Sequence, residues 1–333
     1  MPETRLPLAL LAFVLASAIT LVAARLFAER LDRVGARLGL SEALVGVLTA
    51  LAADGPELSS SLTALLHGER EVGLGIVLGS NVFNLAAMIG VGALVAGAVR
   101  PRRSSLLVEG VVAGAMTAVT ALLLAGVVDP AAALALCALV IVPYAAVLIL
   151  GDLRLHLVPL PGAVHGVLRE ALGGGFAHHR PVEHEPGWRR SATAMALAVA
   201  AIVGGSVAMV RSALVIADEV DLSRAAVGLL VLAVVTSLPN MSTAVRLARQ
   251  RRGDAAVSET FNSNTINLLG GIAVPAVVIG LGAVTAAERS EMLWFAAMTA
   301  VTLLWLARPA GVGRLGGAVL VLAYAMFLAV QLG

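Results

Sequence analysis

Long apolar stretches alternate with short polar ones along the whole chain. The apolar runs last about twenty residues, the length that an α-helix needs to cross the roughly 30 Å hydrocarbon core of a bilayer. Ten stretches are expected to be membrane spans: 6–27, 43–66, 72–98, 106–128, 130–150, 192–216, 225–248, 255–284, 288–307 and 312–332. Strand-like alternation is scarce, so an outer-membrane barrel is not expected. The pattern predicts a membrane protein built from helices.

One polar segment, residues 152–190, divides the predicted spans into five and five. It is rich in Pro and Gly and holds five of the six histidines, and we interpret it as a linker. An alternative is a regulatory metal site at His178, His179, Glu183 and His184, although their spacing fits no rigid set of ligands.

The two halves of the chain match each other without a gap when the sequence is shifted by 183 residues. The matches keep small and polar residue types, which apolar composition alone does not produce: Pro56 with Pro239, Ser59 with Ser242, Ser80 with Ser263, Asn81 with Asn264 and Asn84 with Asn267. Five spans are an odd number, so the second half crosses the membrane in the opposite sense. The predicted fold is therefore an all-α integral membrane protein with ten transmembrane helices, arranged as two inverted five-helix repeats (1–151 and 191–333) with broken helices at the midplane.

Composition and charge agree with a membrane protein and set its orientation. The chain is 59% hydrophobic and 13% charged with a mean hydropathy of +0.95, which excludes an ordinary soluble domain. All 23 basic residues are arginines, and eighteen of them fall at the span ends that face the same side as the linker. The positive-inside rule then places the linker in the cytoplasm and both termini outside. The net charge of +2 reflects this topology and gives no sign of nucleic-acid binding.

Two smaller features narrow the class. The first apolar run is longer than a normal signal core, so we expect a retained span, and the short loops favour a bacterial cytoplasmic membrane. Cys137 is the one cysteine, so an internal disulfide is excluded.

The second predicted span carries two carboxylates and a helix breaker, in the order Asp54, Gly55, Pro56, Glu57. Facing lipid, the two charges would together cost about 5–7 kcal/mol, comparable to the whole stability of a protein. They must face other helices or water, where Pro56 also leaves nearby carbonyls without helical partners. Carboxylate, hydroxyl and carbonyl oxygens form the kind of cage that Ca²⁺ and Na⁺ require.

The following span of each half supplies more oxygen ligands. Ser80 and Asn84, and likewise Ser263 and Asn267, are four residues apart and share a helix face. A single such residue is more often a helix-packing contact than a ligand, but four related by the repeat favour a shared site.

The paired stretches "ALAADGPELSSSL" with "AVVTSLPNMSTAV", and "LGSNVFNLAAMIG" with "FNSNTINLLGGIA", resemble the two alpha-repeats of the cation/calcium exchanger superfamily. The resemblance is specific over about 50 residues in each half. It implies an antiporter with cation sites at mid-membrane that open alternately to each side. Carried over residue by residue, it implies ligands at Glu57, Ser80, Asn84 and Ser263, a hydroxyl pair at Thr236 and Ser237, and backbone carbonyl ligands at Ala50 and Ala233.

The sequence departs from the family pattern mainly in its acids. The second-repeat glutamate is Asn240, and Asn267 stands where sodium/calcium exchangers often carry aspartate. Asp54 is an added carboxylate one turn before Glu57, so both core acids lie in one half. A further candidate ligand, Glu259, precedes Ser263 by four residues, with a structural ion pair near Arg252 as its alternative. Glu109 is expected at the membrane interface.

These residues predict a secondary antiporter that exchanges Ca²⁺ or a related cation against Na⁺ or H⁺. Two close carboxylates favour a shared proton, so Asp54 or Glu57 is expected to titrate during transport. The alternatives are a monovalent Na⁺/H⁺ exchanger and a non-transporting membrane protein. An enzyme is not expected, because the spans hold no metalloprotease motif and no base paired with a serine. The expected partners are the transported cation and the lipid bilayer, without a cofactor, and the sequence does not define the oligomeric state.

Overall fold

The computed structural model describes residues 5–37, 51–155, 162–172 and 188–332, and within these ranges the chain is almost entirely helical. The first half contains α1 (Arg5–Arg37), α3 (Gly55–Leu66), α4 (Arg70–Asn84), α5 (Gly92–Ala96), α6 (Arg103–Leu124) and α7 (Pro130–Leu155). A short helix, α8 (Gly162–Leu172), lies in the segment between the halves. The second half contains α9 (Trp188–Val220), α10 (Arg224–Ala226), α11 (Ala233–Arg249), α12 (Gly253–Leu268), α13 (Val274–Val278), α14 (Ala286–Leu306) and α15 (Arg314–Leu332).

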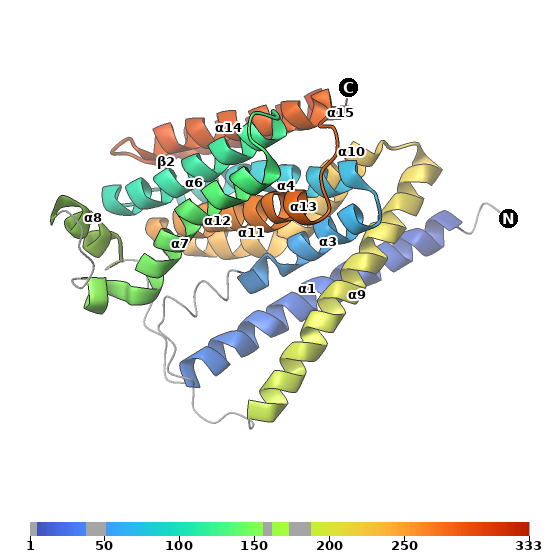
Figure 1. Ribbon diagram of the computed structural model, residues 1–333, viewed down its shortest axis with the longest axis horizontal. Coiled ribbons are helices and arrows are strands. Elements are labelled where there is room, and N and C mark those ends of the chain that lie inside the picture. Colours follow the sequence, from blue (N-terminus) through green and yellow to red (C-terminus); the bar gives the residue numbers. More distant parts are fainter. Residues whose placement is uncertain (1–4, 38–50, 156–161, 173–187, 333) are drawn as a thin grey trace.

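The helices α1 and α9 form a crossed pair along one side of the molecule (Figure 1). Each has 33 residues, which at 1.5 Å per residue is about 50 Å and exceeds the thickness of a hydrocarbon core. The pair packs closely because small residues face each other: a side chain at Gly205 would meet the Thr20 hydroxyl at 2.2 Å. Their outer faces expose large apolar residues such as Leu8 and Val22, as lipid contact requires.

The helix α4 runs through the centre of the remaining bundle. Its apolar window within Arg70–Ala96 is entirely buried, and it contacts α3, α11, α12 and α14. It also lies close to the backbone of the second half, where a Cβ at Gly228 would lie 2.7 Å from the Val72 backbone carbonyl oxygen. Small residues at such crossings let helix backbones approach closely, which drives helix association in membranes.

In the part of the chain that the structure describes, three π-helical segments interrupt the α-helices, and two of them hold corresponding positions in the halves. The segment η1 (Leu85–Val91) follows α4 directly, and η3 (Leu269–Ala273) follows α12 directly. Each therefore begins just after the polar motif of its half. The third segment, η2 (Val227–Leu232), leads into α11. Such π-bulges are rare and frequently lie at functional sites.

The structure refines the sequence predictions in three respects. Seven helices of the described residues are long and apolar enough to cross a membrane, so the count of ten remains a prediction. The predicted break is present in the first half, where residue 54 leaves the helix and α3 begins at Gly55, but in the second half it is wrong: α11 continues through Pro239. A two-residue antiparallel pair, β1 (Ala98–Val99) with β2 (Val312–Gly313), was also not expected.

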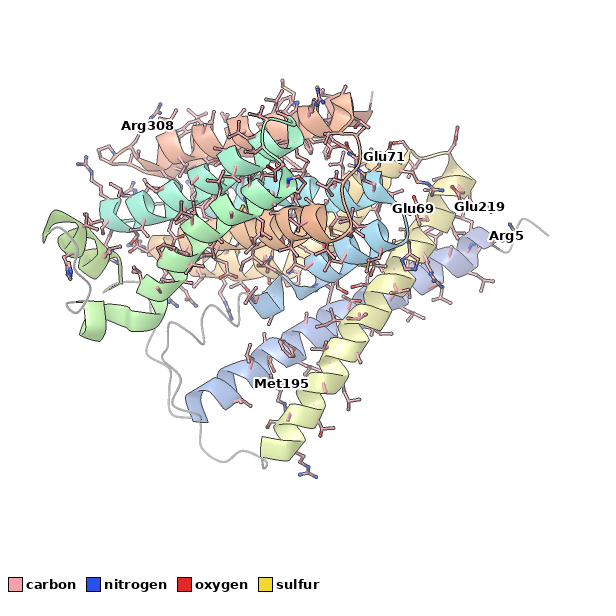
Figure 2. All side chains as sticks on the ribbon, in the orientation of Figure 1. Arg5, Glu69, Glu71, Met195, Glu219 and Arg308 are labelled. Atoms are coloured by element: carbon pink, nitrogen blue, oxygen red, sulfur yellow. The ribbon has the colours of Figure 1, made fainter. Side chains whose placement is uncertain are left out.

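Charged residues gather at the two ends of the bundle. Figure 2 places Arg5, Glu69, Glu71 and Glu219 toward one end and Arg308 at the other. The helices run between these ends, so the faces in between carry the exposed apolar side chains. This arrangement is the one that a bilayer imposes on a bundle.

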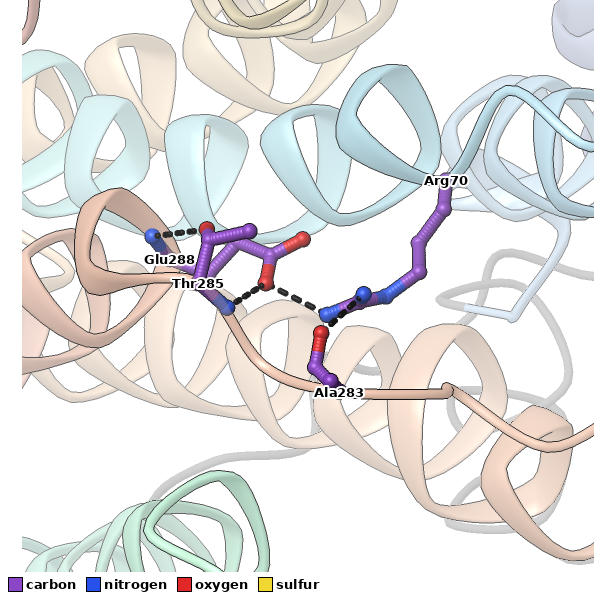
Figure 3. Close-up of polar contacts among 4 residues, drawn as sticks. All are labelled: Arg70, Ala283, Thr285 and Glu288. Atoms are coloured by element: carbon purple, nitrogen blue, oxygen red, sulfur yellow. Dashed lines mark hydrogen bonds and ion pairs between the residues drawn. The ribbon is translucent and has the colours of Figure 1, made fainter.

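At each end an ion pair joins the two halves. Arg70, at the start of α4, donates to the Glu288 carboxylate and to the Ala283 carbonyl, and Glu288 also caps α14 together with Thr285 (Figure 3). At the other end, Arg102 immediately precedes α6, and its Nε lies 2.7 Å from the carboxylate of Asp254 at the start of α12. Each half thus anchors the first turn of a central helix of the other half.

Candidate functional site

Two buried carboxylates lie at the beginning of α3. Asp54 immediately precedes this helix and Glu57 is in its first turn, and each residue is 1% exposed. The partial positive charge of a helix N-terminus favours carboxylates there, and Pro56 is tolerated because its missing N–H is not needed in the first turn. The interruption that Gly55 and Pro56 produce therefore serves to set both carboxylates among polar side chains of the second half.

Each carboxylate is held by groups from α11 and α12. Asp54 Oδ1 accepts hydrogen bonds from the Asn240 amide and the Ser263 hydroxyl, both at 2.7 Å. Glu57 accepts from the Ser237 hydroxyl on one oxygen and from the Asn267 amide on the other. The first half thus contributes the charge and the second half the donors.

At the centre of the network, two asparagines exchange hydrogen bonds. The side-chain amide of Asn81 lies 3.4 Å from the backbone carbonyl oxygen of Asn264, and the side-chain amide of Asn264 lies 3.2 Å from the backbone carbonyl oxygen of Asn81. These residues are 183 positions apart, the same offset that aligns the halves in sequence. A reciprocal pair of this kind is what a local two-fold axis between α4 and α12 produces.

The surrounding contacts repeat the same symmetry. The Asn84 amide donates to Asn264 Oδ1 at 3.0 Å, and the Asn267 amide donates to Asn81 Oδ1 at 3.1 Å. The same two amides also reach serines, Asn84 to Ser263 at 3.2 Å and Asn267 to Ser80 at 3.4 Å. Each contact maps onto its partner by the 183-residue offset, so the halves build one network from equivalent residues.

The network leaves several buried oxygen atoms without a hydrogen-bond donor. These are one carboxylate oxygen and three amide oxygens: Asp54 Oδ2, Asn84 Oδ1, Asn240 Oδ1 and Asn267 Oδ1. The side-chain nitrogens of these asparagines all donate hydrogen bonds, so the atoms that lack a partner are hydrogen-bond acceptors. Among the described residues no arginine or histidine bonds to the network, and its two carboxylates have no counter-ion there. A buried unpaired acceptor costs about 1–3 kcal/mol, so these oxygens favour the binding of a cation.

Most of the residues predicted for the site meet in this network: Asp54, Glu57, Ser80, Asn84, Ser237, Asn240, Ser263 and Asn267. Thr236 is buried but bonds within its own helix, to the Leu232 and Ala233 carbonyl oxygens at 2.8 and 3.3 Å. The Ala233 carbonyl also accepts from Ser237 at 2.8 Å. Ala50, like the histidines of the alternative site, lies outside the described residues.

Glu259 lies apart from these hydrogen bonds. It is half-buried on α12, and Asp54 and Arg246 are the charged groups that act on it. Among the described residues it forms no ion pair with Arg252, but Arg246 is close enough to act on it, so the alternative of a structural charge pair with a nearby arginine stays a prediction. Glu259 lies next to the network, and its role as a peripheral ligand stays a prediction.

Two features of the site were missed by the sequence reasoning. Asn81 and Asn264 were aligned with each other but not chosen as site residues, although their identity in both halves was the available signal. Glu109 was expected at the membrane interface, which stays a prediction, but its burial was not foreseen: it is 7% exposed and hydrogen-bonds to Tyr144 and Ser258. An acidic residue surrounded by an otherwise apolar span was the signal for burial.

The chain resembles known proteins in sequence and in fold. The family model described as sodium/calcium exchanger protein matches residues 8–150 and 190–333. CaxA of Alkalimonas amylolytica is 25% identical over 318 residues, which cover 94% of this chain and 95% of that protein. The crystal structure of the H⁺/Ca²⁺ exchanger CAX has a TM-score of 0.71 at 14% identity, covering 97% of this chain and 85% of CAX. The sodium-calcium exchanger NCX_Mj, soaked with Na⁺ and Sr²⁺, has a TM-score of 0.60 at 18% identity, covering 97% of this chain and 99% of NCX_Mj. At such identities the two structures establish the fold alone.

Proposed function

We propose that this chain, which belongs to the sodium/calcium exchanger protein family, exchanges Ca²⁺ or a related cation against Na⁺ or H⁺ at the buried network between its two halves. The chain is a membrane antiporter of this family rather than an enzyme, and the identity of its ions is the new part of the proposal. The observation that carries it is the set of four buried oxygens without hydrogen-bond donors. One of them belongs to the Asp54 carboxylate, and the Glu57 carboxylate lies in the same network.

The charge of the network suits a divalent cation. Asp54 and Glu57 together supply two negative charges, which balance one Ca²⁺. Ca²⁺ takes six to eight oxygen ligands from carboxylates, amide oxygens, backbone carbonyls and water. Asp54 Oδ2 and the amide oxygens of Asn84, Asn240 and Asn267 offer four such ligands without breaking an existing hydrogen bond. Glu57 joins them when its bonds to Ser237 and Asn267 open.

The counter-ion would use the same groups at a different time. Na⁺ is a hard cation that also prefers oxygen ligands, and H⁺ binds the carboxylates directly. Either ion neutralises negative charge of the two carboxylates and so competes with Ca²⁺. Competition at one site that opens alternately to each side is sufficient for antiport.

We further propose that residues 1–151 and 191–333 are inverted repeats joined by a cytoplasmic linker, with both termini outside. The reciprocal bonds of Asn81 with Asn264 support the repeat. In Figure 1, α1 begins and α15 ends toward the same side, as an even number of crossings requires. The excess of arginines at the linker side supports the orientation.

The decisive experiment uses the purified full chain in liposomes. Uptake of ⁴⁵Ca²⁺ is measured separately under an imposed Na⁺ gradient and an imposed pH gradient. We expect uptake under at least one gradient and its loss in the Asp54→Asn, Glu57→Gln double variant. A matched control is Glu29→Gln, an exposed residue of α1 that pairs with Arg25 and lies away from the network.

The outcomes separate the alternatives. Absence of Ca²⁺ uptake under both gradients, together with ²²Na⁺ movement under a pH gradient, would favour the monovalent Na⁺/H⁺ exchanger. Equal Ca²⁺ uptake by the double variant and the wild type would refute the assignment of the site.

A further inference from the structure

A second buried carboxyl lies outside the cation network, where three helices meet. Glu109 on α6 is 7% exposed and faces Tyr144 on α7 and Ser258 on α12. Its Oε1 lies 2.7 Å from the Ser258 hydroxyl, and its Oε2 lies 3.0 Å from the Tyr144 hydroxyl. Asn262 completes a ring, with its amide nitrogen 3.0 Å from the Ser258 hydroxyl and its Oδ1 2.8 Å from the Tyr144 hydroxyl.

Four contacts close this ring, and each needs one hydrogen. Ser258 and Tyr144 each carry a single hydroxyl hydrogen, and the Asn262 side chain donates toward one neighbour and accepts from the other. These groups supply three hydrogens. Exchanging the nitrogen and oxygen of the Asn262 amide reverses the direction of the bonds but not their number. The fourth hydrogen must come from Glu109 as a carboxylic acid.

We propose that Glu109 is a proton-binding site distinct from the cation network, and that its proton closes a hydrogen-bonded ring that fixes α12 against α6 and α7. With the proton, Glu109 accepts from Ser258 and donates to Tyr144, which in turn donates to Asn262. Without it, the Glu109 carboxylate and the Asn262 amide oxygen compete for the single hydroxyl hydrogen of Tyr144, so one contact of the ring opens. The reaction is a simple gain or loss of one proton by the Glu109 carboxyl.

The helix α12 connects this ring to the cation network. Asn262 is adjacent in sequence to Ser263, whose hydroxyl donates to Asp54 at 2.7 Å. The ring and the network thus lie on different faces of one helix. A proton at Glu109 that holds α12 in place also holds Ser263 and, one turn later, Asn267. Proton binding at Glu109 and cation binding at the network are therefore coupled. This coupling rests on the proposed cation transport, whereas the proton site at Glu109 is independent of it.

Other charged groups border the helices that surround Glu109. A Cβ at Gly110 would lie 3.1 Å from Leu303 of α14, which is near the end of that helix opposite to Glu288 and Glu291. Besides Cys137 and Tyr144 on α7, the titratable or charged described side chains on the elements packed against α6 are Asp254 and Glu259 on α12, His165 and Glu170 on α8, and Glu288, Arg289 and Glu291 on α14. Asp254 is paired with Arg102 at 2.7 Å. A variant of Glu109 itself is therefore needed to assign a pH effect to this site.

The first test observes the proton directly and needs no transport. Infrared difference spectra of the reconstituted full chain are recorded between neutral and alkaline pH. We expect a protonated-carboxyl C=O band that is lost in Glu109→Gln and retained in the control Glu29→Gln. In Tyr144→Phe the band should persist at higher frequency, because the acid has lost its hydrogen-bond acceptor. A band that is identical in the wild type and Glu109→Gln would overturn the proposal.

The second test measures coupling. Glutamine mimics the protonated acid, since its amide oxygen accepts from Ser258 while its N–H donates to Tyr144, so folding should be retained and can be checked by thermal unfolding. We expect ⁴⁵Ca²⁺ uptake by this variant to depend less on pH than uptake by the wild type, because residue 109 no longer gains or loses a proton. An unaltered pH profile, with the infrared band lost, would remove the coupling but keep the proton site. If the protein moved no Ca²⁺ at all, the infrared result would still decide the proposal independently of the proposed function.

Discussion

Replacement of Asp54 by Asn is the sharpest probe of the cation network, because it removes one charge and little else. Oδ1 of the new side chain can still accept from Asn240 and Ser263, as it does at 2.7 Å in the wild type. The oxygen that is lost is Oδ2, the one without a donor. The substitution therefore separates cation binding from the hydrogen bonds that hold the helices.

The magnitude follows from electrostatics. Two unit charges 4 Å apart interact by about 4 kcal/mol at an effective dielectric constant near 20, and a divalent cation doubles this to about 8 kcal/mol. Desolvation offsets part of the gain, and removal of one partner of a buried pair typically costs about 3–5 kcal/mol. We therefore expect the apparent affinity for Ca²⁺ to fall roughly a hundredfold to a few thousandfold.

Thermal unfolding in detergent with and without Ca²⁺ measures this effect. At Ca²⁺ one hundred times above its Kd, the wild type should gain about 2.7 kcal/mol of stability, and the variant should gain almost nothing at the same concentration. Without Ca²⁺ the variant should be no less stable than the wild type, because a buried charge without a counter-ion has been removed. Asp129→Asn is a matched control, since Asp129 is exposed and caps the start of α7 through a bond to the Ala132 amide. The reasoning is refuted if Asp54→Asn retains the full stabilisation by Ca²⁺, or if it unfolds more readily than the wild type without it.

Three further predictions concern the network, the ends of the bundle and pH. Alanine at Asn81 or Asn264 should lower the free energy of unfolding by about 1–3 kcal/mol, and the loss in the double variant should differ from the sum, because both side chains belong to one hydrogen-bonded network; unfolding of all three variants measures this. Arg70→Ala should cost roughly 1–3 kcal/mol, since it leaves the Glu288 carboxylate buried without its cation, and adding Glu288→Gln should restore part of the loss in the same assay. Protonation of the network removes negative charge, so the apparent Km for Ca²⁺ uptake should rise as pH falls, by up to about tenfold per pH unit for one competing proton; a Km independent of pH would exclude this competition at Asp54.

The membrane class and most residues of the buried network could be predicted because their signals are local or repeated. Apolar runs report burial in lipid without reference to any other part of the chain. The offset of 183 residues brought Ser80 and Asn84 into correspondence with Ser263 and Asn267, and the structure places all four in one network. A pair of carboxylates in an apolar span also has few places to lie other than a polar interior.

The features that were missed depend on how helices cross. Asn81 and Asn264 lie at the centre of the network because α4 and α12 cross at these two residues. No pattern along a single helix reveals where it crosses another. Glu109 is buried because Tyr144 from another helix covers it. Pro239 was expected to break its helix, but an internal proline costs only about 3 kcal/mol, which the packing of a buried helix can offset. Sequence patterns indicate which residues avoid lipid and do not indicate which neighbours they meet.

The paired π-helical segments mark where the chain length can change at the heart of the protein. Each begins immediately after an asparagine-bearing motif, at Leu85 in one half and Leu269 in the other. Such a segment holds about one residue more than an α-helical turn, and the residues beyond it keep the faces that they present. Deleting a residue from a regular part of the helix would rotate everything beyond it by about 100°, including the face that η1 turns toward α15. Deleting one residue within the π-helical segment would instead close an ordinary α-helical turn and leave that face in place.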